Sequence, residues 1–556
     1  MISLPATVAG GNNLVALPLE LFLSILSFLP NRDIKALRLT GSSIRDRARL
    51  RLDRVFLSAN RRNIEVFRAI ANHETFRQRV VEIIWDDARL IDWPLEDAIK
   101  IGGELYCLKN GAYYENITCG CNDLCDCDTA RGCPAWFTRA CRKNIENLTN
   151  YKHYDVYLPG RVPRAYQVTA QHPTRQSWEY YQGLLRIQKA VLASGADISA
   201  FRFGLEQFPA LQRITITPAG HGFLFAPLYE TPMIRDFPYG FNYPIPRSWP
   251  IMLDGIPTEA CEWVADSYEM QRNQWRGFQI VMRALAQAWN HRITELVIDV
   301  NQLPTGLNCR IFDQPCREYD DLVLLLERPS FSRLDLSLLV GGLEHDDWPS
   351  FRRGLLRRAL AKAVDLQHIS LCTDVIFDPA ADASISDSGG SIKHFIPLQS
   401  IFPVERWPRL RHFGLSGFLV MQTDVLKLLA ALPPTVRSIE LNFLYFLDGG
   451  GDYCDLLVQM RDTLSWRNRA VEERPRVSIG TEEISLVSNR RVWVDDEVTE
   501  FLYYDGENPF WAQSPNNILK NSGIGIVRDA FEPEYERPYV NLSTLMKLGY
   551  KKQENF

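Results

Sequence analysis

The feature of this sequence that most constrains its fold is a recurring unit, in which an amphipathic helix precedes a short apolar strand. Clear strands of this kind are residues 211–217, 293–300 and 366–371, and each follows a segment with helical periodicity. One such unit cannot bury its own apolar face, whereas stacked units share a continuous core. The crossovers between the strands should be right-handed, so the strands should run parallel. We therefore expect an α/β structure with a parallel sheet.

Two later strands have nearly the same pattern, Leu-x-x-Leu/Ile-x-Leu, as residues 410–415 and 436–441 show. The helix between them covers about residues 423–432. This pattern resembles the strand of a leucine-rich repeat, although the spacing of the units is irregular. The resemblance favours an irregular, leucine-rich-repeat-like α/β solenoid with long insertions over residues 62–480. An ordinary α/β domain with a parallel sheet is the alternative.

The start of the chain has a different expected secondary structure, with three short helices within residues 14–58. The first follows Pro18 and is expected to carry Leu21, Phe22, Ile25, Leu26 and Leu29 at helical spacing on one face. Pro30 should end it, the second helix carries Ile34 and Leu37, and the third opens near Ser42. Such short helices bury little apolar surface by themselves, so a partner usually completes such a unit.

The order of these residues, Leu-Pro-x-Glu-Leu, then Ile-Leu, then a Leu-Pro break and Asp-Ile, resembles the F-box. The resemblance implies docking onto a Skp-type adaptor and, through it, onto a cullin ubiquitin ligase. With the sequences of residues 83–90 and 523–533, the whole chain resembles the large F-box protein family of filamentous fungi. This resemblance implies that the repeat region binds a protein substrate. The implied adaptor contacts are Leu17, Pro18, Leu21, Ile25, Leu26, Leu29, Ile34 and Leu37.

Charge is uneven along the chain. The net charge is −5, yet residues 31–62 hold ten Lys or Arg against three Asp. A basic stretch steers acidic partners, and an acidic adaptor suits it better than DNA does. A nucleic-acid-associated scaffold that uses this stretch stays an alternative. Because nothing resembles a groove-reading module, we do not expect specific nucleic-acid binding.

Cysteines gather in one place, since seven of the 12 lie between residues 107 and 141. The paired spacings Cys119-x-Cys121 and Cys125-x-Cys127 offer four thiolates for one structural zinc ion. In a reducing compartment, grouped thiols suggest metal more than disulfides. The alternative is an insertion with free, redox-exposed cysteines.

Linear signatures of enzymes are missing from the sequence, including the dinucleotide, P-loop and zinc-protease motifs. We therefore expect a binding protein with no catalytic residues and no cofactor, and an enzyme without a linear motif is the alternative. No apolar run approaches the ~18 residues of a membrane span. The first eleven residues lack the features of a signal peptide. A cytoplasmic or nuclear location is expected, rather than secretion or contact with a membrane.

The expected organisation is a disordered start (1–13), the three-helix unit (14–58), the repeat region (62–480) and a C-terminal capping extension (481–556). Three insertions interrupt the repeat region. They are a Cys-rich segment at about 105–142, a loop rich in proline and aromatics at about 219–257, and a flexible loop at about 378–392. We expect the aromatic loop to pack onto its own scaffold, and a recognition loop is the alternative.

Overall fold

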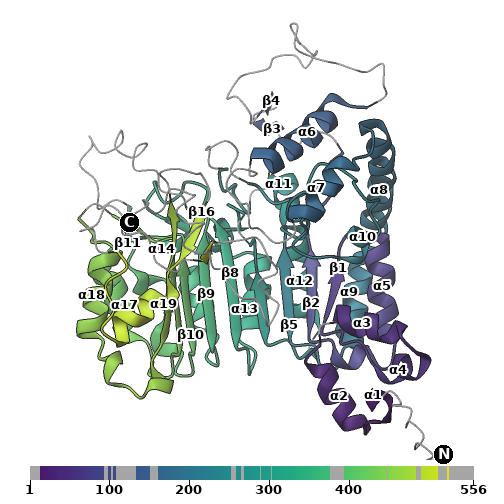
Figure 1. The fold of residues 1–556 in the computed structure, drawn as a ribbon. Coiled ribbons are helices and arrows are strands. Elements are labelled where there is room, and N and C mark those ends of the chain that lie inside the picture. Colours follow the sequence, from purple (N-terminus) through teal and green to yellow (C-terminus); the bar gives the residue numbers. More distant parts are fainter. Residues whose placement is uncertain are drawn as a thin grey trace, which may run out of the picture.

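The structure is a computed structural model. It describes residues 13–29, 31–92, 98–101, 104–107, 133–150, 161–251, 258–264, 268–288, 290–301, 303–375, 394–447, 449–483, 490–510 and 523–524. The chain is a mixed α/β structure with a parallel sheet and a helical region at its N-terminus (Figure 1). The α/β class and the parallel sheet expected from the sequence are confirmed.

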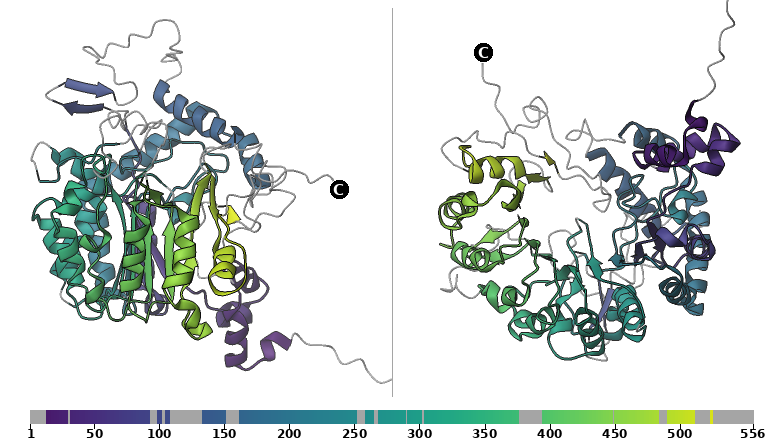
Figure 2. Two further views of the ribbon diagram at one scale, coloured as in Figure 1. Left: turned by 90° about the vertical axis from the view of Figure 1, so that its left-hand side faces the viewer. Right: turned by 90° about the horizontal axis from the view of Figure 1, so that it is seen from below.

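The main sheet has ten strands, and neighbouring strands in it follow one another in the sequence. All of its pairings are parallel. Its strands are β1 (Arg54–Leu57), β2 (Glu82–Asp86), β5 (Arg213–Thr217), β6 (Glu295–Ile298), β7 (Leu307–Asn308), β8 (Arg333–Leu339), β9 (His368–Thr373), β10 (His412–Ser416), β12 (Ser438–Asn442) and β14 (Arg476–Ser478). Viewed along the strands, the sheet follows an open arc with helices on its outer side (Figure 2).

The helices that cover the outer side supply amphipathic faces to one continuous core. They include α5 (Arg61–Asn72), α9 (Ala196–Gln207), α12 (Arg276–Gln287), α13 (Arg317–Leu326), α14 (Pro349–Arg352), α15 (Leu355–Leu360), α17 (Gln422–Ala431), α18 (Tyr453–Thr463) and α19 (Asp495–Tyr503). Helices α6 (Ala135–Asn150), α7 (Arg161–Thr169) and α8 (Thr174–Ser194) lie above one end of the sheet (Figure 1).

One residue of each main strand except β7 faces these helices in register, and together they form an apolar row. The row is Val55, Ile83, Ile214, Leu296, Leu334, Ile369, Phe413, Ile439 and Val477, all essentially buried. Each residue just before this row points to the opposite face, because side chains alternate along a strand. That second row is polar: Arg54, Glu82, Arg213, Glu295, Arg333, His368, His412, Ser438 and Arg476. Because of this alternation, the outer face of the sheet is apolar, and the polar row lies on the inner face where the strands begin.

Neighbours in the polar row neutralise one another. Arg54 pairs with Glu82 at 3.1 Å, and Arg213 pairs with Glu295 at 2.6 Å. Further along, the rings of His368 and His412 stack with their centroids 3.9 Å apart. Cross-strand pairs of this kind fix the register of adjacent strands.

The sequence pattern located most strands, and the structure corrects it in two places. Strand β1 lies inside the range expected for the N-terminal helices (14–58), yet it pairs with β2 and belongs to the sheet. The segment with helical periodicity before residues 366–371 is not one helix but two, α14 and α15, separated at Gly354, whose φ of 74° is left-handed. Glycine tolerates that conformation without a steric penalty.

The C-terminal extension and two insertions are described in part. In the extension, β15 (Gly480–Glu483), β16 (Arg490–Trp493) and β17 (Gly523–Ile524) form a small antiparallel sheet. At the start of the Cys-rich insertion, β4 (Glu104–Cys107) pairs with β3 (Ala98–Ile101), which precedes the insertion. The expected disordered start and the expected flexible loop at 378–392 lie outside the described residues, apart from Asn13. Among the helices that the structure describes, none is long and apolar enough to cross a membrane.

The loop rich in proline and aromatics packs onto its own scaffold, as expected, over its described part. Tyr229, Phe241, Tyr243 and Trp249 are buried. Several of these rings join a cluster with α6 and α8, in which Phe137 and Tyr181 lie 5.2 Å apart between centroids. The loop is therefore a structural cover over one end of the sheet.

Asp87 ties this loop to the sheet and to α12. Its buried carboxylate accepts the Trp249 indole N–H at 2.9 Å and the Gly277 backbone N–H at 3.0 Å. The Trp85 indole N–H is a third, longer donor at 3.4 Å. One side chain thus satisfies donors from a strand, a loop and a helix.

The neighbouring Asp86 is also buried, and it is held beside His221 and Ala88. It accepts the Ala88 backbone N–H at 3.1 Å, and its nearest His221 nitrogen is 3.9 Å away. His221 Nδ1 also lies 2.9 Å from the Tyr243 hydroxyl. Burial raises the pKa of Asp86 to about 7 and lowers the pKa of His221 to about 3. At pH 5 both groups are therefore neutral, and they form no ion pair.

We expect the unfolding free energy of the Asp86→Asn variant, minus that of the unmodified chain, to increase as pH rises from 4 to 7. In the unmodified chain, the unfolded state loses its Asp86 proton near pH 3.8, whereas the folded state keeps it to about pH 7. Between these values stability falls with rising pH, by at most about 1.4 kcal/mol per unit from this group. Asparagine keeps an acceptor for Ala88 and removes the titration. Urea unfolding across this pH range measures the difference, and a constant difference would contradict the assignment.

Candidate partner-binding site

Residues 13–50 form what we call the helical module, which extends below β1 and α5 at one end of the sheet (Figure 1). It consists of α1 (Asn13–Ala16), α2 (Leu19–Ser27), α3 (Asn31–Leu39) and α4 (Ser42–Arg47). Pro18 precedes α2, where its fixed φ suits the entry to a helix. Gly41 precedes α4 in an extended conformation. The three helices expected in this region are present.

A small apolar core holds the module together. Its buried members are Phe22, Leu26, Ile34, Ile44 and Ala48. Leu14, Leu17, Leu29, Leu37 and Leu50 pack against them while partly exposed. The core is separate from the main core of the sheet, so the module has its own packing.

Arginines from the basic stretch donate hydrogen bonds to backbone carbonyls at the ends of these helices. Arg47 donates to the Leu17 carbonyl at 2.7 Å, and its guanidinium lies 4.7 Å from the Phe22 ring centre. Arg51 donates to the carbonyls of Ser27 and Leu29. Arg38 donates to the Ala48 carbonyl at 3.1 Å. These guanidiniums satisfy helix-end carbonyls that have no partner within their helix, so much of the basic stretch is used inside the protein.

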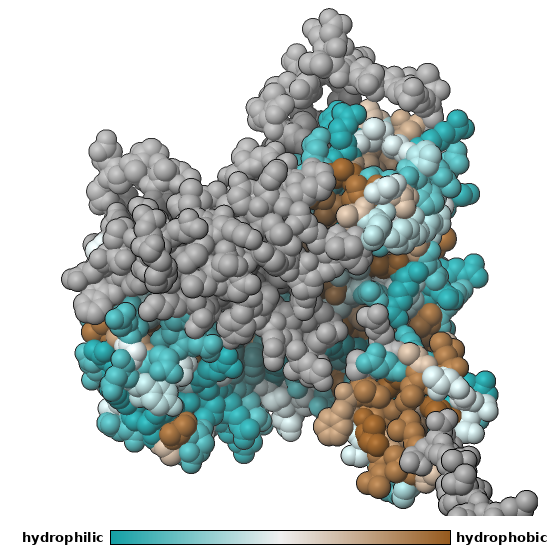
Figure 3. Space-filling view, viewed as in Figure 1, coloured by the Kyte–Doolittle hydropathy of each residue, from teal (hydrophilic) through white to brown (hydrophobic). Residues whose placement is uncertain are grey.

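Helix α2 has more apolar surface than the module core covers, which is the most informative property of the module. Phe22 and Leu26 face the core, whereas Leu21 and Ile25 face outward and are 55% and 41% exposed. Leu19, Leu23 and Phe28 are exposed as well, and so is Leu39 at the end of α3. Figure 3 shows the resulting apolar surface over the module, beside the more polar surface of the sheet region. Glu20, Ser24 and Ser27 form the polar side of α2, and its apolar side is broader than the module core covers.

The adaptor-contact residues expected from the sequence differ in their exposure in the structure. Pro18, Leu21 and Ile25 are exposed and available to a partner, and Leu17, Leu29 and Leu37 are half-buried. Leu26 and Ile34 are buried in the module core, so their expected direct contact is corrected to a supporting role. Leu21, Phe22, Ile25 and Leu26 share the expected apolar side of α2, on which Phe22 and Leu26 face the core and Leu21 and Ile25 are exposed. Leu23, Phe28 and Leu39 are exposed apolar residues that the expected contacts did not include.

A cavity of about 480 Å³ continues the apolar surface of α2. Leu23, Leu26 and Ile34 line it from the module, and Phe76 lines it from the segment after α5. Arg49, Arg51 and Arg79 also line it. The cavity joins apolar walls with cationic groups, which favours an occupant that is apolar and acidic at once.

The expected zinc ligands Cys119, Cys121, Cys125 and Cys127 lie outside the described residues, and zinc binding there stays a prediction. The side chains of two other cysteines of that segment are described. Cys141 is buried in α6 and its thiol lies 3.6 Å from the Asn242 carbonyl, while Cys133 is half-buried. Burial raises the pKa of the Cys141 thiol to about 12, so it is a protonated core residue at neutral pH.

Comparisons with known proteins identify no family for this chain. No protein-family model matches it. No curated protein is significantly similar to it.

Proposed function

We propose that the chain is an F-box substrate receptor of a cullin ubiquitin ligase. The helical module docks on a Skp-type adaptor, and the remainder binds a protein substrate. The observation that carries this proposal is α2, whose outer residues Leu21, Ile25 and Phe28 are exposed although its inner side already packs in a core. An exposed apolar surface of this kind marks a site of protein interaction.

The repeat region supports the second half of the proposal. We propose that it is a leucine-rich-repeat-like solenoid, because each strand pairs with strands adjacent in the sequence and the same position of every strand faces the helices. Stacked units of this sort expose a broad inner surface to ligands. The polar row from Arg54 to Arg476 lies along that surface.

The charge of the module fits an acidic adaptor. Lys35, Arg45 and Arg49 are exposed on it, and Arg49 also lines the cavity beside α2. A nucleic-acid scaffold is supported less well, because Arg38, Arg47 and Arg51 donate to carbonyls of the module. An enzyme is supported less well too, since Asp86 and His221 are each only 3% exposed.

Co-purification tests the proposal directly. The full chain, expressed with a Skp-type adaptor and a cullin, is expected to elute with both in one complex at physiological salt. The adaptor should be retained when the cullin is omitted, whereas the cullin should be lost when the adaptor is omitted. A chain that binds neither would overturn the proposal, and direct cullin binding without the adaptor would do so as well.

A further inference from the structure

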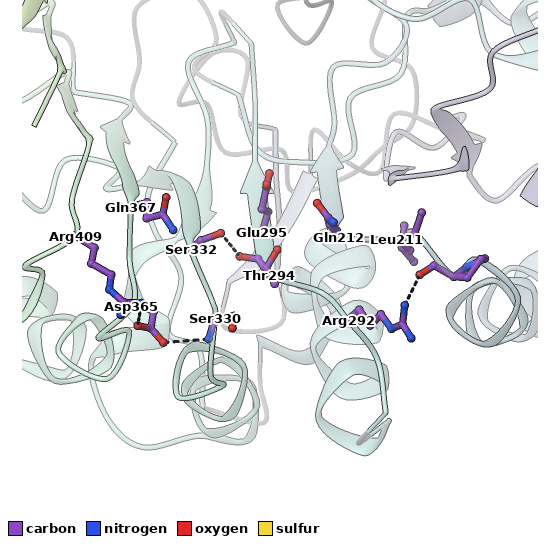
Figure 4. A pocket seen from close by; sticks show the side chains of 12 residues that line it. Leu211, Gln212, Arg292, Thr294, Glu295, Ser330, Ser332, Asp365, Gln367 and Arg409 are labelled. Carbon is purple, nitrogen blue, oxygen red and sulfur yellow. Dashed lines mark hydrogen bonds and ion pairs between the residues drawn. The ribbon is translucent and has the colours of Figure 1, made fainter. Parts of the chain in front are cut away.

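A second candidate binding site lies where the strands begin, at the edge of the sheet shown in Figure 4. It is a groove of about 630 Å³, within the range of natural ligand sites. Four polar residues cross its floor in register: Gln212, Thr294, Ser332 and Gln367, each directly before strand β5, β6, β8 or β9. Backbone hydrogen bonds of 2.8 to 2.9 Å join each of them to the next.

Two arginines accompany this floor: Arg292 precedes β6 beside Thr294, and Arg409 precedes β10, one strand beyond Gln367. Arg292 is exposed and donates to the Pro209 carbonyl at 3.2 Å, and the described part of the chain gives it no ion pair. Arg409 is also exposed, with its guanidinium 2.9 Å from Asp365. Asp365 in turn accepts the Ser330 backbone N–H at 3.1 Å. Both cations therefore keep donors that face solvent, because a guanidinium has five N–H groups.

The remaining charge in the groove is already balanced. Glu295 pairs with Arg213 at 2.6 Å, so it does not cancel Arg292. The groove consequently offers the cation Arg292, which has no ion pair among the described residues, the Arg409–Asp365 pair with guanidinium N–H groups still free, and neutral amides and hydroxyls beside them. This arrangement complements a ligand with two separated anionic groups and a polar backbone.

The spacing of the arginines defines the ligand further. Arg292 precedes β6 and Arg409 precedes β10, and the sheet order places three inter-strand steps between these strands. At about 4.8 Å a step, the separation is about 14 Å. An extended peptide covers the same length in about four residues.

From these observations we propose that the groove binds an extended peptide with acidic side chains four residues apart, which contact Arg292 and Arg409. Gln212 and Gln367 would donate to and accept from its backbone. A single-stranded nucleic acid fits less well, because none of the described residues that line the groove is aromatic, and such ligands normally stack on aromatic rings. Peptide binding by the groove does not depend on the proposed function. Only the identification of the peptide as part of a substrate rests on that function.

Fluorescence anisotropy with labelled synthetic peptides tests the proposal on the full chain. A peptide with the sequence Glu-Thr-Val-Thr-Glu, capped at both ends, is expected to bind, and added salt should weaken it. The peptide Glu-Glu-Thr-Val-Thr has the same charge with adjacent acids, and we expect it to bind about tenfold more weakly. Equal affinity for the two peptides, or no binding by the first, would overturn the proposal.

Matched variants locate the site. Arg292→Gln and Arg409→Gln should each weaken binding of the first peptide by about tenfold. Arg406→Gln removes an exposed arginine that does not line the groove, and it should leave binding unchanged. An equal loss in all three variants, or tighter binding of a single-stranded oligonucleotide that competes with the peptide, would contradict the assignment. Thermal unfolding controls for folding, and adaptor capture by the same variants separates failure of this site from failure of the proposed function.

Discussion

Replacing Leu21 and Ile25 together by alanine is expected to abolish capture of the Skp-type adaptor and to leave the chain folded. The two residues lie one turn apart on the outer side of α2, and neither belongs to the module core. Burial of a leucine or isoleucine side chain contributes about 1.5–3 kcal/mol, so the double substitution should cost about 3 kcal/mol or more. That loss weakens binding by about a hundredfold or more. Pull-down of the adaptor by the purified variant measures it.

Two further variants make this result specific. Val471→Ala removes an equally exposed apolar side chain at the other end of the sheet, and adaptor capture should not change. Leu26→Ala instead creates a cavity in the module core, which should destabilise the module by about 2–5 kcal/mol. Retention of the adaptor by the Leu21/Ile25 double variant would remove the main support for the docking site.

The Asp87→Ala variant is expected to show the largest loss of folding stability, about 3–5 kcal/mol. The substitution leaves the buried indole N–H of Trp249 and the buried N–H of Gly277 without their acceptor, and each unpaired donor costs about 1–3 kcal/mol. It also frees the loop around Trp249 from α12. Denaturant unfolding of the purified chain, followed by tryptophan fluorescence, measures the change.

A graded series tests this cause. Asp87→Asn keeps one acceptor oxygen, so it should lose less stability than Asp87→Ala. Asp92 is an exposed acid of the same segment, and Asp92→Ala removes only its ion pair with Lys189. Exposed pairs are worth about 0–1 kcal/mol, so that control should stay close to the unmodified chain. A similar effect of all three substitutions would show that Asp87 has no special role.

The sequence by itself determined the secondary structure of the repeat region and the parallel sheet. Residues such as Ile214, Leu296 and Leu334 lie in short apolar strands whose pattern is local, and helical crossovers between such strands require parallel pairing. The same local pattern located α2 and α3, because a proline and apolar spacing are visible without tertiary contacts. The F-box assignment of these helices rests on the resemblance and stays a prediction.

Only the tertiary structure decided which apolar residues of the module are free. Leu26 and Ile25 are adjacent in a helix, and sequence periodicity placed both on one face, yet Leu26 enters the core and Ile25 faces outward. Tertiary structure also brings together the residues of the proposed peptide groove. Arg292 and Arg409 are far apart in the sequence, and only the stacking of β6, β8, β9 and β10 sets their separation. Local pattern indicates the type and approximate place of most elements, whereas packing between elements sets which side chains meet and which remain exposed.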